Sequence, residues 1–166
     1  MGLPWYTVRE RPDRDRLIAA GEPRLQRFLQ LARELDLAVV LHAPHEAAAP
    51  ALALLREERI ERAVFHWHKA SPEVTRAIVE AGYDISVTPE TCYRQRDQAL
   101  VDAVPLNHLV IETDGPWPYS GEFEGRPTEP TFLGRIVDAI ATIKDVAREE
   151  VGEIVTENTR RLFRLP

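Results

Sequence analysis

Short apolar runs alternate with longer segments of mixed polarity along most of this chain. The apolar runs have the length and the β-branched content of buried strands, whereas the longer segments carry apolar residues at helical spacing. The first clear helix is predicted from the residues of one apolar face, which are Leu25, Phe28, Leu29, Ala32 and Leu35. The charged, proline-interrupted stretch 9–16 before it is predicted to be a connection.

The same pattern predicts four strands and five further helices. The strands are predicted to end at His42, His66, Thr88 and Asp114, and residues 2–6 resemble the tail of another strand. The helices are predicted at residues 47–57, from Ser71-Pro72-Glu73 to a stop at Gly82, and at 95–104, 131–144 and 148–163. Alternation of strands and helices without hairpin signals predicts an α/β fold with a parallel sheet. Right-handed crossovers then bring the carboxyl ends of the strands to one edge.

Three of these strands end on a residue type that binds metal ions, namely His42, His66 and Asp114. An unpaired polar group at the end of a buried strand costs roughly 1 to 3 kcal/mol, so three such endings suggest a common partner. Two imidazoles and a carboxylate suit zinc, manganese or iron better than calcium. The alternative is that each histidine packs at the sheet rim and that Asp114 only begins a turn.

The loops after the strands carry further candidates for substrate binding. Positive side chains there would favour an anionic substrate such as a phosphodiester, and they are Lys69, Arg94, Arg96 and Arg126. Aromatic residues of the loop 115–130 could stack on bases or anchor their own loop, and they are Trp117 and Tyr119.

Three other side chains have both a functional and a structural interpretation. His68 follows the second strand and could meet substrate or simply be solvated. Glu129 could position an arginine or cap the next helix, and His45 more simply starts a helix. We assign no role to His108, which begins its strand at the far end from the predicted site.

Length and composition limit these interpretations. The 166 residues suit one substantial domain but are few for a complete eight-stranded α/β barrel, which has about 250. The net charge of -6 argues against a broad nucleic-acid-coating surface, although it permits a local basic cleft. Cys92 is the only cysteine, which excludes an internal disulfide. Because we find no membrane-spanning run and no signal peptide, we expect a cytoplasmic protein.

From Gly2 to Phe163 the chain resembles the TatD family of metal-dependent hydrolases, in the amidohydrolase superfamily. The resemblance rests on an ordered set of short motifs, each weak alone. They are Val39-Val40-Leu41-His42, Val64-Phe65-His66 followed by Ser71-Pro72-Glu73, Ile111-Glu112-Thr113-Asp114-Gly115-Pro116, Arg126-Pro127-Thr128-Glu129-Pro130, and Thr156-Glu157-Asn158-Thr159-Arg160-Arg161-Leu162-Phe163.

The resemblance implies a distorted TIM-type (β/α) barrel with one or two divalent metal ions, zinc, manganese or magnesium, at its mouth. It also implies hydrolysis of phosphodiester bonds, commonly as a deoxyribonuclease acting on DNA. The residues His42, His66 and Asp114 match the family's metal-binding positions, and Asp114 also matches its proton acceptor.

This chain departs from the family pattern in two places. Thr128 stands where the family usually has Asn, and the family's His-x-His pair and bridging Glu have no counterpart. Gly2-Leu3-Pro4 aligns just after that Glu, so we expect residues 1–166 to be one partial barrel of about four parallel strands, the C-terminal portion of the family fold.

A partial barrel of this kind has exposed sheet edges, and we expect these edges to favour self-association or pairing with a missing N-terminal portion. The alternatives to a phosphodiesterase are a noncatalytic half-barrel or assembly subunit, and a related amidohydrolase acting on amides or lactones.

Overall fold

The computed structural model describes residues 1–166, which divide into two compact units, Met1–Asp84 and Ile85–Pro166. Helices and parallel strands alternate through both units, so the predicted α/β fold with four parallel strands is confirmed. The prediction that both units form one domain stays a prediction. No helix combines the length and the apolar character needed to cross a bilayer.

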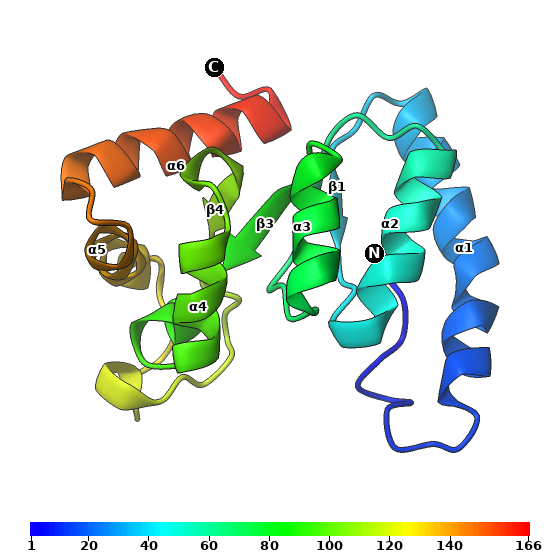
Figure 1. Ribbon diagram of the computed structural model, residues 1–166, viewed down its shortest axis with the longest axis horizontal. Helices are drawn as coiled ribbons and strands as arrows, with labels where there is room; N and C mark the ends of the chain where they lie inside the picture. The colour runs from blue at the N-terminus through cyan, green and yellow to red at the C-terminus, as the bar shows by residue number, and fades with distance from the viewer. The chain divides into compact units, whose positions relative to one another are not determined.

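The first unit is built on two parallel strands, β1 (Val39–Leu41) and β2 (Ala63–Phe65). Helix α1 (Arg14–Glu34) packs side by side with α2 (Ala48–Glu57), and the unit ends with α3 (Pro72–Glu80) (Figure 1). Near the amino terminus, Gly2 forms a parallel bridge with His42 and thereby continues the sheet beyond β1.

Local signals set the ends of α3 as predicted. The Ser71 hydroxyl accepts a hydrogen bond from the backbone N–H of Val74, and Pro72 occupies the first turn. After the helix, Gly82 has a φ of 83°, a left-handed conformation that glycine adopts without a steric penalty. The chain can therefore turn directly into the next strand.

The second unit contains the parallel pair β3 (Asp84–Val87) and β4 (Leu109–Ile111). The short 3-10 helix η2 (Pro89–Cys92) and α4 (Gln95–Ala103) follow β3, and α5 (Leu133–Lys144) and α6 (Arg148–Phe163) complete the unit (Figure 1). The buried side-chain amide of Asn158 donates to the carbonyls of Leu106 and Leu109, at 2.9 and 2.8 Å, which fixes α6 against the start of β4.

Three details differ from the pattern-based predictions. Helix α1 begins at Arg14, inside the stretch predicted to be a connection, and it includes Pro23. On its predicted apolar face, Phe28 and Leu35 are 48% and 58% exposed. Strand β4 ends at Ile111, so Asp114 lies in the following loop and not at the last strand position.

Helix α1 offers a matched test of which side chains hold the first unit together. We predict that Leu29→Ala, at a fully buried position, lowers the free energy of unfolding by about 2 to 5 kcal/mol because it leaves a cavity. The neighbouring Phe28→Ala should change it by about 0.5 kcal/mol or less. Urea unfolding followed by circular dichroism measures both values, and equal effects would contradict this packing of α1.

Candidate functional site

The two candidate histidines of the first unit lie side by side. Strands β1 and β2 pair with Leu41 opposite Phe65, which places His42 and His66 at the same end of neighbouring strands. The His66 backbone N–H donates to the Leu41 carbonyl at 3.0 Å, and the two imidazole centroids are 5.7 Å apart with an interplanar angle of 43°. Both side chains are half-buried at this end of the strands. The parallel register therefore creates a pair of neighbouring nitrogen ligands.

An exposed tyrosine extends this pair toward the surface. The Tyr6 ring centroid is 5.8 Å from that of His42, and the Arg9 guanidinium carbon is 6.0 Å from the centre of the Tyr6 ring. Tyr6 is 46% exposed. No local pattern marks Tyr6 as a site residue, because only the bridge between Gly2 and His42 brings the N-terminal segment to the end of β1.

The remaining histidines of the loops in this unit have structural contacts. His68 is 2% exposed, and its Nε2 lies 2.8 Å from the Thr75 hydroxyl. Burial, with a smaller contribution from the nearby His45, lowers the pKa of His68 to about 4. The His45 ring lies 5.1 Å from that of Trp5. The predicted substrate contact of His68 stays a prediction, but its side chain is buried and not solvated.

In the second unit, the loop after β4 carries Asp114. Asp114 has a φ of 46°, and its carbonyl accepts a hydrogen bond from the Trp117 N–H at 3.1 Å. The Tyr119 hydroxyl donates to the Thr113 carbonyl at 2.7 Å. Burial raises the pKa of Tyr119 well above its ordinary range, and the negative charges of Asp114, Glu112 and Glu90 act in the same direction. Tyr119 thus anchors the loop, whereas Trp117 is 50% exposed.

The predicted arginines of this unit are each paired with a carboxylate. Arg94 and Arg96 both contact Glu90, through Nε at 2.7 Å and Nη2 at 3.0 Å. Arg126 Nη2 donates to Glu129 at 3.2 Å, while the Glu129 side chain makes no capping bond to the helix that follows. Of the two predicted roles for Glu129, the structure therefore favours positioning an arginine.

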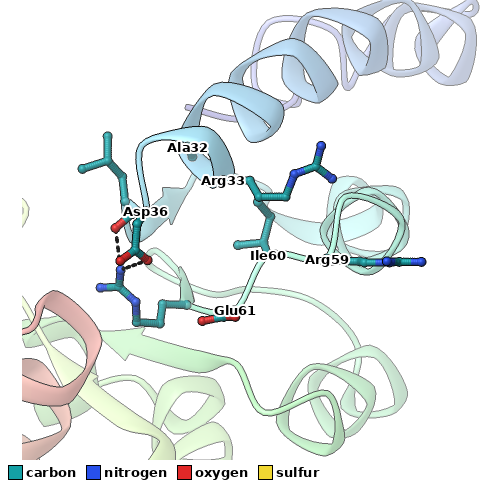
Figure 2. Close-up of a pocket in the computed structure, with 8 residues that line it drawn as sticks. Ala32, Arg33, Asp36, Arg59, Ile60 and Glu61 are labelled. Atoms are coloured by element: carbon teal, nitrogen blue, oxygen red, sulfur yellow. Dashed lines mark hydrogen bonds and ion pairs between the residues drawn. The ribbon is translucent and has the colours of Figure 1, made fainter.

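Two cavities flank the strands of the first unit at opposite ends. One, of about 470 Å³, is lined by His42 of the histidine pair, with Gly2 and Arg24 among the other residues. The other, of about 350 Å³, lies where β1 and β2 begin, and there Arg62 Nη2 donates to the Asp36 carbonyl and carboxylate at 2.6 and 2.9 Å (Figure 2). The second cavity is remote from the histidine pair because it surrounds the opposite strand ends.

The donor set fits a divalent metal ion in part. His42 and His66 provide two adjacent imidazoles of the kind that zinc or manganese binds. Nowhere in the structure do three or more His, Cys, Asp or Glu side chains gather in a group that could hold a metal ion. The histidine pair belongs to the first unit and Asp114 to the second, so a ligand set of all three remains a proposal.

Comparison with known proteins decides the family. Residues 1–164 match the model of the family described as "TatD related DNase". This chain belongs to that family. It is 32% identical to a metal-dependent hydrolase of Haemophilus influenzae, described as uncharacterized, over 99% of this chain and 64% of that protein. It is also 32% identical to the human deoxyribonuclease TATDN3, over 90% of this chain and 61% of that protein.

A solved structure agrees with this assignment. The crystal structure of YJJV, a TatD homologue of Escherichia coli K12, superposes with a TM-score of 0.84 and 25% identity, covering 100% of this chain and 62% of that one. The resemblance to TatD proteins and the α/β fold are thereby confirmed. This chain spans a little under two thirds of the length of these relatives.

The buried His68 predicts a pH dependence of stability. A folded-state pKa of about 4 against an ordinary value of 6.5 means that the unfolded chain binds the proton more tightly. The stabilisation that His68 confers should therefore be complete above pH 6.5 and fall as the pH drops toward 4, by about 2 kcal/mol between pH 7 and pH 5.

Urea unfolding in the presence of a chelator at both pH values measures this loss. The variant His68→Gln keeps a side chain that can bond Thr75 but does not titrate. Between pH 7 and pH 5, its free energy of unfolding should therefore fall by about 2 kcal/mol less than that of the wild type. Identical pH dependence in both proteins would show that His68 is not the responsible group.

Proposed function

We propose that this chain carries part of the active face of a metal-dependent hydrolase that cleaves phosphodiester bonds in DNA. The observation that supports the proposal most directly is the pair His42 and His66, held 5.7 Å apart at the ends of neighbouring parallel strands. Membership of the TatD family supports the reaction class, and the name of the human relative supports DNA as substrate. A cytoplasmic location is part of the same proposal.

In this proposal His42, His66 and Asp114 hold a divalent ion, zinc, manganese or magnesium. When bound, such an ion polarises a phosphoryl oxygen and makes water more acidic. The imidazoles must be neutral to bind it, so metal affinity should weaken at low pH. The half-buried carboxylate of Asp114 would accept the proton from the attacking water, which requires that it be ionised.

The surrounding side chains of the second unit suit a nucleic acid strand. Arg94 and Arg126 are each about half exposed and would contact phosphates, with Glu129 orienting Arg126. Trp117 is exposed in the loop after Asp114 and would stack on a base. The substrate contact predicted for His68 is part of this proposal, and the side chain that would make it is buried.

A noncatalytic assembly subunit is a second candidate, and one observation favours it. Helix α1 and the residue that caps its end expose an apolar stripe at helical spacing, formed by Phe28, Leu31 and Leu35, at 48%, 46% and 58% exposure. Such a stripe is typical of a helix face that packs against another polypeptide. The chain would then act in a complex, through self-association or with a partner that completes the fold. Hydrolysis of amides or lactones is a third possibility within the superfamily, but the exposed arginines favour a phosphate substrate.

Metal binding tests the ligand assignment. We predict that the purified chain binds zinc or manganese weakly and that the combined variant His42→Ala, His66→Ala, Asp114→Ala does not. Isothermal titration calorimetry measures the affinity. His108→Ala, at the opposite end of β4, is the matched control and should bind as the wild type does. Equal binding by the wild type and the combined variant would remove this assignment.

Hydrolysis tests the reaction. We expect slow, metal-dependent cleavage of a labelled oligodeoxynucleotide, far below that of a full-length relative, because this chain spans less than two thirds of the relatives' length. Asp114→Asn should reduce the rate by a factor of about 100 or more, since it removes the proton acceptor. Gel analysis of the products measures the rate, and an unchanged rate in the variant would contradict the proposed role.

A further inference from the structure

A buried carboxylate in the second unit holds two arginines that differ in what they can still bind. Glu90 follows β3 in the short helix η2 and is 2% exposed. A carboxylate removed from water is strongly unfavourable unless cations compensate it. Here Glu90 Oε1 pairs with Arg94 Nε at 2.7 Å, and Oε2 pairs with Arg96 Nη2 at 3.0 Å. Each carboxylate oxygen is thus satisfied by a different guanidinium.

Arg96 uses both its Nε and its Nη2 within this cluster, and its side chain is 49% exposed. Its Nε and Nη2 both donate to the buried carboxylate of Asp97, at 3.1 and 2.7 Å, in addition to the contact of Nη2 with Glu90. Two sides of its planar fork are therefore committed to protein groups. Arg96 is best explained as the structural member of the cluster.

Arg94 keeps binding capacity on its outer side. Glu90 contacts its Nε, and the charge of Glu90 is the main cause that raises the pKa of Arg94, with a smaller contribution from a hydrogen bond with Tyr93. A guanidinium has five N–H donors, so these contacts leave donors for another acceptor. The Arg94 side chain is 50% exposed, which makes those donors accessible.

Backbone hydrogen bonds also hold Arg94 in place. The Arg94 N–H donates to the Glu90 carbonyl at 2.7 Å, and the Thr88 hydroxyl accepts from the Glu90 N–H at 3.4 Å. A side chain fixed in advance loses less conformational entropy when it binds a ligand. Glu90 therefore organises Arg94 before any ligand arrives.

The cluster lies at the end of the sheet that carries Asp114. Strands β3 and β4 are parallel, with Val87 opposite Ile111, so the segments after both strands leave from one edge. The Tyr93 hydroxyl accepts a hydrogen bond from the Ser120 N–H at 3.2 Å, which fixes the loop after β4 against the residue that precedes Arg94. A strand of nucleic acid that reaches Asp114 would therefore pass close to Arg94.

Stability of the adjacent helix does not account for Arg94. Helix α4 begins at Gln95, and Arg94 precedes it without making a capping hydrogen bond. The N-terminal end of a helix carries a partial positive charge, which disfavours a cation at this position. The buried Glu90 accounts for the positive charge of Arg94, and a negatively charged ligand would account for the donors that stay exposed.

We propose that Arg94 is a phosphate contact for single-stranded DNA and that Glu90 is the positioning residue that presents it. The choice of DNA rests on the proposed function, whereas the geometry of the pair does not. Arg94 would donate from its terminal amino groups to a phosphate oxygen while Glu90 keeps its Nε, so that one guanidinium bridges a buried carboxylate and a bound phosphate.

Binding of a fluorescein-labelled single-stranded oligodeoxynucleotide, in EDTA and at several salt concentrations, tests this proposal by fluorescence anisotropy. Arg94→Ala should weaken binding about tenfold and lower the slope of log K against log salt by about 0.7, the loss of one phosphate contact. Arg94→Lys should keep the slope and lose part of the affinity, because its ammonium cannot span both groups. Arg160→Ala is the matched control, because it also removes one arginine but at the opposite end of β4 from Arg94. The residue next to it, Arg161, donates to the Asn107 carbonyl, which lies just before β4.

Glu90→Gln separates positioning from simple charge. If only charge mattered, removing the negative charge of Glu90 should tighten DNA binding. If Glu90 positions Arg94, its loss should weaken binding, and this is the result that we expect. If thermal unfolding shows that this variant does not fold, Glu90→Asp takes its place. It keeps the charge on a shorter side chain and should also bind more weakly.

Three results would overturn the proposal: no binding by the wild-type chain at low salt, equal binding by Arg94→Ala, or binding by the Glu90 variant as tight as wild type. The proposed hydrolysis is measured separately, with metal present. Loss of that activity alone would leave the Arg94 contact standing, and loss of the contact alone would leave the hydrolysis standing.

Discussion

The register between parallel strands is the constraint on which the candidate chemistry depends. Leu41 pairs with Phe65 through a fixed pattern of backbone hydrogen bonds, and both side chains are buried. A slip of one residue would move every side chain of a strand to the other face of the sheet. The core therefore fixes the register, and the register sets His42 beside His66. The first two candidate ligands are therefore held by the packing of the residues that directly precede them, Leu41 and Phe65.

The same principle arranges the second unit with different side chains. The pairing of β3 with β4 brings two loops to one sheet edge, one with Glu90 and Arg94 and the other with Asp114. Hydrogen bonds from one loop to the other, such as that between Ser120 and Tyr93, then set their mutual position. Buried strands thus support exposed loops that carry the polar groups, as in other α/β proteins with sites at the carboxyl ends of strands.

The second unit exposes arginines although the chain as a whole is acidic. The chain is acidic, with a formal net charge of -6, yet three arginines of the second unit are half exposed. Arg94 and Arg126 lie in loops, whereas Arg96, predicted to lie in a loop, is in the first turn of α4. Each is paired with a carboxylate that offsets its charge. Their suitability for a phosphate depends on which N–H donors remain accessible and on how firmly the guanidinium is held. The net charge of the chain gives no information on which N–H donors are accessible.

The sequence by itself determined the order of elements and, to within one residue, where β1, β2 and β3 end, whereas it placed the end of β4 three residues too late. His42 and His66 could be chosen as ligands because apolar runs end on them, and Ser71, Pro72 and Gly82 set the limits of α3 through local backbone chemistry. The family could be identified from short motifs for the same reason, since each motif is a local arrangement.

Only the tertiary structure decided which side chains are buried. Glu90, His68 and Phe28 illustrate this, because a carboxylate and an imidazole lie inside while an aromatic residue of the predicted core lies outside. Burial depends on contacts between segments far apart in the chain, and no local pattern encodes them. The role of Glu90 follows from such contacts.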